Sequence, residues 1–294
     1  MSQGPAITIC VGATKAGTSW LYNAMAAHPE CGFRTVKELH YFDSIRDGQT
    51  VARVNEFKTE KARLKRKLDT VGVAKQMELN RRIADLRDWI SVLSRPHSNC
   101  AAYLEFLTAG NEAQRVVGEV TPAYATLPEE TLRDIADMAD DVRIIYLMRD
   151  PVARIWSHIR MVAGRNTTDP AQFERSVAAK LDLLLDRDPL MAKRGDYVGA
   201  LDKLRAAVAP ARLLTMFTED LMTPAGLERL WDFLGVKRVA TDLSRRVYEG
   251  LPLAMTDDQR QRARVALQPQ YAGVGKLFAD LPEVWRRNME EVLA

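Results

Sequence analysis

A glycine-bounded loop between an apolar run and an amphipathic stretch constrains this chain more than any other segment. Residues 7–12 form a short apolar run with β-branched side chains, which predicts a buried strand. Residues 18–27 carry large apolar side chains at helical spacing, and Pro29 predicts the end of that helix. A strand that enters a helix through a glycine loop leaves free backbone N–H groups where an anion binds. The segment therefore predicts an anion-binding loop in an α/β fold.

The spacing inside the loop differs from that of nucleotide-triphosphate P-loops. The P-loop pattern G-x-x-x-x-G-K-[ST] places its lysine after the second glycine. Here Gly12 and Gly17 fit the pattern, but Thr18 follows the second glycine and the cation lies inside the loop, at Lys15. The alternative is a tight strand–helix turn with an incidental lysine. The candidate anion-binding residues are Thr14, Lys15, Ala16, Gly17, Thr18 and Ser19.

Four apolar runs of strand length alternate with helical patterns along the chain. They occupy residues 7–12, 116–120, 142–148 and 212–217, and a helix is expected over residues 224–234. Strands that alternate with helices indicate a parallel sheet covered on both faces. We therefore predict an α/β chain with a P-loop NTPase-like three-layer fold around a central parallel sheet, organised as a single domain over residues 1–294.

The segment of residues 50–110 has a different character. Apolar residues from Leu79 to Leu93 recur at steps of three and four, an earlier helix is expected over residues 54–68, and Gly72 separates the two. We predict a helical hairpin inserted into the α/β domain. Residues 51–95 hold 12 Lys or Arg and 6 Asp or Glu, a local charge of +6, so the rest of the chain sums to −3. A solvated face is the simplest interpretation; an anionic substrate, a membrane surface, a partner or a homo-oligomer contact are the alternatives.

Composition excludes several classes of protein. A net charge of +3 from 42 Lys or Arg and 39 Asp or Glu argues against a general nucleic-acid binder. Three cysteines are too few, and odd in number, for a disulfide framework, which favours a reducing compartment. No apolar run reaches the ~20 residues of a membrane span, and the first residues do not read as a signal peptide. We expect a cytoplasmic protein.

Two blocks of the sequence resemble a known family. The loop around Lys15 resembles the K-x-G-T-x-x-L loop with which sulfotransferases bind the 5′-phosphosulfate of 3′-phosphoadenosine 5′-phosphosulfate (PAPS). The block at residues 143–157 is a strand that ends in R-D-P at Arg149, with Ser157 eight residues later. It resembles the segment that binds the 3′-phosphate in that family.

Further blocks support the same resemblance. The stretches K-E-L-H-Y-F-D and G-E-V-T-P-A-Y, at residues 37–43 and 118–124, resemble those of heparan-sulfate 3-O-sulfotransferases. Shorter C-terminal blocks resemble the family at residues 195–201, 217–221 and 233–235. Val120 stands where the heparan-sulfate enzymes have a lysine, which puts a heparan-like acceptor in doubt. The disulfide loop of the Golgi enzymes and the R-K-G-x-x-G-D-W-K block of the cytosolic ones are missing.

The resemblance implies roles for particular residues. Lys15, with the loop N–H groups and hydroxyls, would receive the charge that develops on the leaving 5′-phosphate, and Arg149 and Ser157 would bind the 3′-phosphate. Glu38 would be the general base toward a hydroxyl or amine, with His40 as the second candidate. PAPS would be the sulfuryl donor, with no metal. The acceptor would be a small molecule, a lipid or a carbohydrate.

Other functions stay open at this point. A magnesium-dependent P-loop kinase of a small molecule would hold its metal with Asp150, which also follows an apolar strand. A non-catalytic protein that binds PAP (3′-phosphoadenosine 5′-phosphate) or another nucleotide would need the phosphate sites but no base. Near the C-terminus, Tyr248, Gly250 and Lys276 are candidates to close over the adenosine, although ordinary packing is the simpler interpretation.

Overall fold

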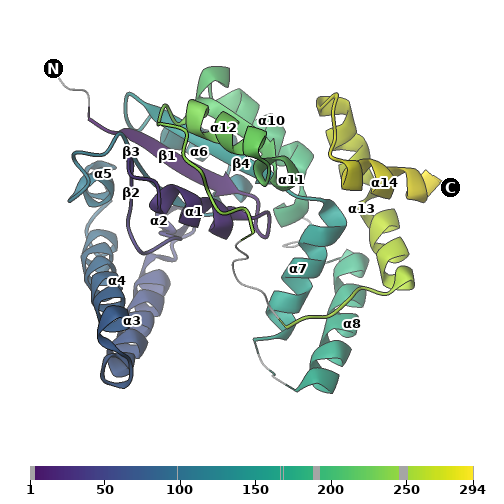
Figure 1. Cartoon of the computed structure of the whole chain (residues 1–294), viewed down its shortest axis with the longest axis horizontal. Coiled ribbons are helices and arrows are strands. Elements are labelled where there is room, and N and C mark those ends of the chain that lie inside the picture. Colours follow the sequence, from purple (N-terminus) through teal and green to yellow (C-terminus); the bar gives the residue numbers. More distant parts are fainter. Residues whose placement is uncertain are drawn as a thin grey trace.

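Five parallel strands form the centre of the molecule in the computed structural model (Figure 1). The structure describes residues 4–97, 99–165, 167, 169–187, 193–244 and 251–293. The strands lie in the order β2-β3-β1-β4-β5, and their bounds are β1 (Ala6–Gly12), β2 (Cys31–Phe33), β3 (Val116–Val120), β4 (Val142–Met148) and β5 (Leu213–Phe217). The predicted parallel sheet is confirmed. β2 escaped prediction because three residues are too few to show a pattern.

Helices cover both faces of this sheet, which is why its strands read as continuous apolar runs. α1 (Thr18–Ala26) packs against β2 and β3, and α6 (Glu129–Ala136) packs on β4 and α10 (Tyr197–Ala207). The ring of His28 contacts Trp231 of α12 (Pro224–Phe233), with centroids 4.8 Å apart, so the end of α1 lies beside α12. Shorter elements are α2 (Tyr41–Arg46), α5 (Ala101–Thr108), α11 (Thr218–Leu221), η1 (Leu68–Thr70), η2 (Tyr124–Thr126) and η3 (Pro210–Arg212).

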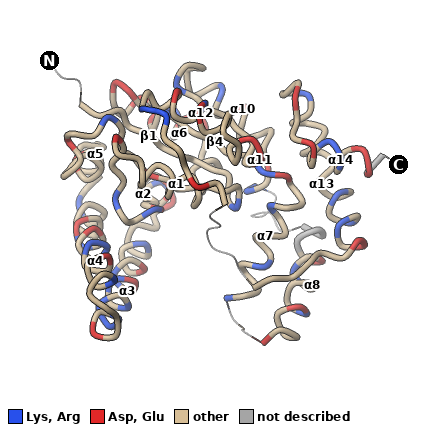
Figure 2. The backbone as a smooth tube through the Cα atoms, viewed as in Figure 1, with Lys and Arg blue, Asp and Glu red and all other residues tan. Residues whose placement is uncertain are grey.

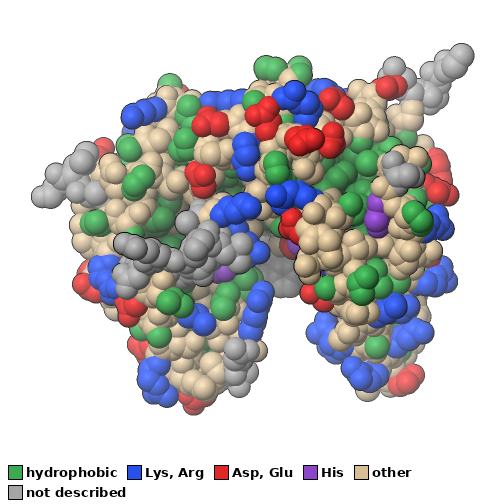
Figure 3. Space-filling view, turned by 180° about the vertical axis from the view of Figure 1, so that it is seen from behind, with side chains coloured by type: hydrophobic (Ala, Val, Ile, Leu, Met, Phe, Trp, Pro, Cys, Tyr) green, Lys and Arg blue, Asp and Glu red, His purple; other side chains and the backbone are tan. Residues whose placement is uncertain are grey.

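Two helix pairs project from the same side of the sheet (Figure 1). One is the hairpin of α3 (Thr50–Lys67) and α4 (Val73–Leu93), along which basic residues recur (Figure 2). The other is α7 (Pro151–Ala163) with α8 (Pro170–Arg187), joined by a small apolar core of its own. Seen from behind, a hollow opens between the two pairs, with Lys and Arg side chains along its walls (Figure 3).

Two C-terminal helices complete the molecule. α13 (Asp257–Leu277) packs against α7, α8 and α10, and α14 (Glu283–Leu293) packs on α13. A reciprocal capping box between Thr256 and Gln259 fixes the start of α13. Across the described residues, no helix is both long and apolar enough to cross a membrane.

The register of the sheet brings the chemistry-bearing loops to one edge. Cys10 is paired with Val120, and Met148 with Phe217, so the neighbouring strands end close together. The loop after β1 and the first residues after β3, β4 and β5 therefore meet at the carboxyl edge of the sheet, where α/β folds bind ligands.

Candidate anion-binding and catalytic site

The loop of residues 12–17 turns sharply between β1 and α1. Lys15 (φ 69°) and Gly17 (φ 78°) both lie in the left-handed region, which favours glycine. A Cβ atom on Gly17 would lie 2.8 Å from Cγ2 of Thr218, so only glycine fits there. The hydroxyl of Thr218 bridges the carbonyl oxygens of Ala16 (2.7 Å) and Met148 (2.9 Å). This contact ties the loop to the end of β4.

The first turn of α1 faces the loop with its backbone N–H groups. Gly17 is the N-cap of α1, and no side chain caps the helix. Of the predicted anion-binding residues, Thr18 is buried, and Thr14 and Ser19 are half-buried. A helix N-terminus without a side-chain acceptor is a ready site for an anion.

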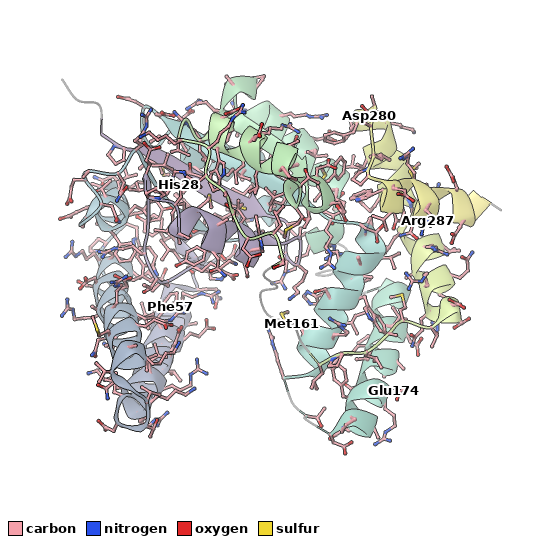
Figure 4. All side chains as sticks on the ribbon, viewed as in Figure 1. His28, Phe57, Met161, Glu174, Asp280 and Arg287 are labelled. Atoms are coloured by element: carbon pink, nitrogen blue, oxygen red, sulfur yellow. The ribbon has the colours of Figure 1, made fainter. Side chains whose placement is uncertain are left out.

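The structure brings Lys15 and Arg149 together at this edge. Nη1 of Arg149 lies 3.4 Å from the carbonyl oxygen of Lys15. Nζ of Lys15 lies 3.6 Å from Sδ of Met161, on the side of α7 turned toward the hairpin (Figure 4). Burial first, and then the charges of Arg149 and Lys37, lower the pKa of Lys15. Neither Lys15 nor Arg149 has a carboxylate within ion-pair distance in the part of the chain that the structure describes.

Helix α7 contributes a further cation that the sequence did not single out. Arg154 is 1% exposed, and its Nε and Nη1 have no hydrogen-bond partner among the described residues. Its guanidinium lies directly against Gly195, where there is no room for a Cβ atom. Burial and then the charge of Arg154 lower the pKa of His158 to about 4. The predicted Ser157 is half-buried on the same helix.

Glu38, His40 and Asp43 form a row beside α2. Nδ1 of His40 lies 2.6 Å from Oδ2 of Asp43, and its Nε2 lies 3.6 Å from Oε2 of Glu38. Nζ of Lys37 donates to Oε1 of Glu38 at 2.6 Å. Burial raises the pKa of Glu38, but His40 and Lys37 outweigh it and hold it at about 2. Burial lowers the pKa of His40, but Asp43 and Glu38 outweigh it and bring it to about 9. At neutral pH the row therefore holds a Glu38 carboxylate beside a protonated His40.

A buried carboxylate, Glu119, fixes the chain segment that carries this row. It is 1% exposed, and burial raises its pKa. Its oxygens accept four hydrogen bonds, from the N–H of Leu39 (3.1 Å) and the hydroxyls of Thr121 (2.5 Å), Tyr103 (2.7 Å) and Tyr124 (2.9 Å). The sequence signal for this role, which the sequence analysis does not use, is a single carboxylate near the end of an otherwise apolar strand.

Both carboxylate oxygens of Asp150 accept hydrogen bonds from the protein itself. Its Oδ1 accepts from the N–H of Ala153 at 2.8 Å, which caps α7. Its Oδ2 accepts from Tyr271 (2.6 Å) and Asn288 (2.8 Å), and the residue is 1% exposed. Among the described residues, no group of three or more His, Cys, Asp or Glu is placed to hold a metal ion.

A cleft of about 220 Å³ runs along α1 from Trp20 to the chain just beyond its C-terminal end. Trp20, Asn23 and Ala24 line one wall, and residues 239–242 line the other. Lys276 is exposed on α13. Tyr248 and Gly250, the other candidates to cover an adenosine, lie outside the described residues.

Comparison with known proteins identifies the family. Residues 6–240 match the model of the sulfotransferase family. The chain is 29% identical to mouse heparan sulfate glucosamine 3-O-sulfotransferase 3A1 over 148 residues, 50% of this chain and 37% of that enzyme. It is 29% identical to human heparan sulfate glucosamine 3-O-sulfotransferase 3B1 over 130 residues, 44% of this chain and 33% of that enzyme. The matched part thus spans little more than a third of these curated relatives.

A solved structure has the same fold. The sulfotransferase from Alicyclobacillus acidocaldarius superimposes with a TM-score of 0.62 at 20% identity, covering 97% of this chain and 100% of that one. Because the family model matches most of the chain, this protein belongs to the sulfotransferase family.

Protonation of His40 makes stability depend on pH. Its folded-state pKa of about 9 exceeds the ordinary 6.5, so the contribution is complete below 6.5 and is lost as pH rises through about 9. We expect the free energy of unfolding of wild type, relative to His40→Gln, to fall by on the order of 2 kcal/mol across this window. Urea titrations across the window measure it. Asp43→Asn should weaken the same dependence, and a difference that stays constant with pH contradicts the assignment.

Proposed function

We propose that this chain transfers the sulfuryl group of PAPS to a hydroxyl or amine of an acceptor. The observation that carries the proposal is the pair of Lys15 and Arg149 beside the uncapped N-terminus of α1, neither of which has a carboxylate partner among the described residues. The buried Arg154 of α7 adds a further cation without a carboxylate partner in the same part of the chain. Like charges in a half-dry site repel each other unless an anion is bound. PAPS brings two anionic groups, a 5′-phosphosulfate and a 3′-phosphate, and so matches these cations.

The loop serves the leaving group. As the bond from the acceptor oxygen or nitrogen to sulfur forms, the bond from sulfur to the 5′-phosphate oxygen breaks, and negative charge grows on that phosphate. Lys15, the N–H groups of α1 and the hydroxyls of Thr18 and Ser19 are positioned to stabilise this charge. Arg149 and Ser157 hold the 3′-phosphate at the start of α7. The reaction ends with PAP and a sulfated acceptor.

Glu38 is our proposed base, and Lys37 sets its strength. In the ligand-free chain a pKa of about 2 makes Glu38 a weak base. Lys37 donates to Glu38, and its charge also acts on Lys15 of the loop. An anion at the loop competes for the Lys37 ammonium, and its partial withdrawal raises the pKa of Glu38 toward the working range. His40 stays protonated and keeps the carboxylate oriented.

The cleft along α1 is our proposed adenine site. It lies along the helix that follows the phosphate loop, and Trp20 offers an aromatic wall, the surface on which a purine packs. The side chain of Glu38 is 45% exposed, and the hollow between the two helix pairs (Figure 3) is our proposed route by which an acceptor reaches it.

The kinase alternative is less well supported. It needs Asp150 to hold magnesium, yet both carboxylate oxygens of Asp150 already accept hydrogen bonds from the protein and the residue is buried. A non-catalytic binding protein fits these cations but gives no reason for the row of Glu38, His40 and Asp43.

Donor binding tests the proposal directly. We expect PAP to raise the melting temperature of the chain equally with and without EDTA, because the site binds phosphate through its own cations. A kinase would instead show ATP binding that depends on magnesium. If PAP produces no thermal shift, the proposed donor is wrong.

Substitution of the base separates catalysis from binding. Glu38→Gln keeps the side-chain shape but cannot take a proton, so we expect sulfuryl transfer to fall by roughly 10²- to 10⁴-fold with unchanged PAP affinity. Transfer of labelled sulfate from PAPS across a panel of hydroxyl and amine acceptors measures the first, and calorimetry measures the second. Glu78→Gln, an exposed carboxylate paired with Lys75 on α4, is the control. Full activity of Glu38→Gln would contradict its role.

We expect Arg154 to lower the stability of the ligand-free chain and to strengthen the binding of PAP. Arg154→Met removes a buried cation with two unpartnered nitrogens, so we expect the ligand-free chain to be stabilised by about 1 kcal/mol or more. The thermal shift caused by PAP should shrink in the same variant. Urea unfolding and PAP titration measure both effects, with the exposed Arg175→Met on α8 as the control. A destabilised variant with normal PAP binding would show that Arg154 serves packing alone.

A further inference from the structure

The C-terminal helices α13 and α14 reach the point where Arg149 leaves β4. Both helices lie beyond residues 6–240, the part that matches the family. Tyr271 of α13 and Asn288 of α14 donate to the same oxygen of Asp150, the neighbour of Arg149, at 2.6 and 2.8 Å. Tyr271 and Asn288 are 1% and 3% exposed. Buried hydrogen bonds to a charged group are among the strongest in a protein, and losing one is costly.

The two donors are themselves held in place. Nε of Arg264 donates to Oδ1 of Asn288 at 2.8 Å, which turns the amide nitrogen toward Asp150. Arg264 is anchored in turn by an ion pair with Glu291. Burial and the Asp150 carboxylate raise the pKa of Tyr271 far above its ordinary value, so its hydroxyl keeps its proton and donates.

A second connection from α13 reaches the backbone of Arg149. The hydroxyl of Tyr197 donates to the carbonyl oxygen of Arg149 at 2.6 Å. The N–H of Tyr197 donates to Oε1 of Gln270 on α13 at 2.8 Å. Tyr197 is therefore held between α13 and the residue that follows β4.

The helix α14 makes a third connection, through Glu219. The N–H of Asp150 donates to Oε1 of Glu219 at 2.9 Å, and Oε2 of Glu219 lies 3.4 Å from Nε1 of Trp285 on α14. The peptide that joins residues 149 and 150 is thus fixed on both sides by contacts that lead to the C-terminal helices.

We propose that Tyr271 and Asn288 are positioning residues for the 3′-phosphate of the donor. By holding Asp150 they set the direction in which Arg149 leaves the sheet, and so the position of its guanidinium beside the loop. The inference rests on the proposed function, because it requires Arg149 to bind that phosphate. A binding group must be held to within about 0.5 Å of its working position, which a free strand end does not ensure.

The test compares two ligands that differ only in the 3′-phosphate. Calorimetry gives the Kd of PAP and of 5′-AMP for wild type, Tyr271→Phe and Asn288→Ser. We expect each substitution to weaken PAP about tenfold, the effect of one lost hydrogen bond to a charged group, and to leave 5′-AMP unchanged. Arg287→Ala on α14, an exposed residue paired with Glu283 (Figure 4), is the matched control and should bind both ligands normally.

Each possible pair of affinities either supports or overturns the positioning role of Tyr271 and Asn288. Equal losses for PAP and 5′-AMP would mean a general distortion of the site, and unchanged affinity for both would mean that the C-terminal helices only pack; either result overturns the inference. Tyr271→Phe changes α13 and Asn288→Ser changes α14. If one of the two variants fails to fold, the other still tests the inference. A wild-type chain that binds PAP no more tightly than 5′-AMP overturns the proposed donor itself, before any substitution is made.

Discussion

Uncompensated positive charge at the carboxyl edge of the sheet is the constraint on which this structure depends. Lys15 and Arg149 lie close together and, like the buried Arg154, have no carboxylate partner in the described part of the chain, so in the absence of ligand these cations raise the free energy of the fold. Their mutual repulsion cannot hold them in place. Neutral groups must do so: the hydroxyls of Thr218 and Tyr197 bind the backbone of the loop and of Arg149.

The same constraint explains how the buried carboxylates are satisfied. Glu119 accepts from hydroxyls and one backbone N–H, and Asp150 accepts from a tyrosine, an asparagine and a backbone N–H. If either carboxylate were paired with Lys15 or Arg149, the charge of that cation would be neutralised, and the cation would no longer be available to bind an anionic ligand. Neutral donors satisfy the oxygens of a buried carboxylate without that loss. The row beside α2 does pair acids with cations, Glu38 with Lys37 and His40, and we propose that it faces the acceptor.

Local patterns made the sheet and the loop predictable, and long-range contacts made the rest unpredictable. A few neighbouring residues suffice to predict the strand before Gly12 and the strand before Arg149. The fold class and the meeting of Lys15 with Arg149 at one sheet edge therefore followed from the sequence. The partners of Glu119 come from segments up to 80 residues away, and Tyr271 lies 121 residues from Asp150. No periodicity marks such pairs, because they exist only once the sheet and helices have packed. The unpartnered nitrogens of Arg154 became visible for the same reason only in the packed structure.

Distance decides what the basic hairpin can do. Its base is near the site, since the charge of Arg53 acts on the pKa of His40. Residues 63–67 lie ten or more positions farther along α3, roughly 15–20 Å at 1.5 Å per residue. That is about two Debye lengths at physiological salt, so these cations neither hold the donor nor tune Glu38.

Val120, which replaces a lysine of the heparan-sulfate enzymes, is fully buried, and its N–H donates to the carbonyl oxygen of Lys37 at 3.3 Å. Lys37 and the protonated His40 are therefore the cations beside the proposed base Glu38, and an acceptor would use the charge of residues 63–67 only if it extended from Glu38 along α3.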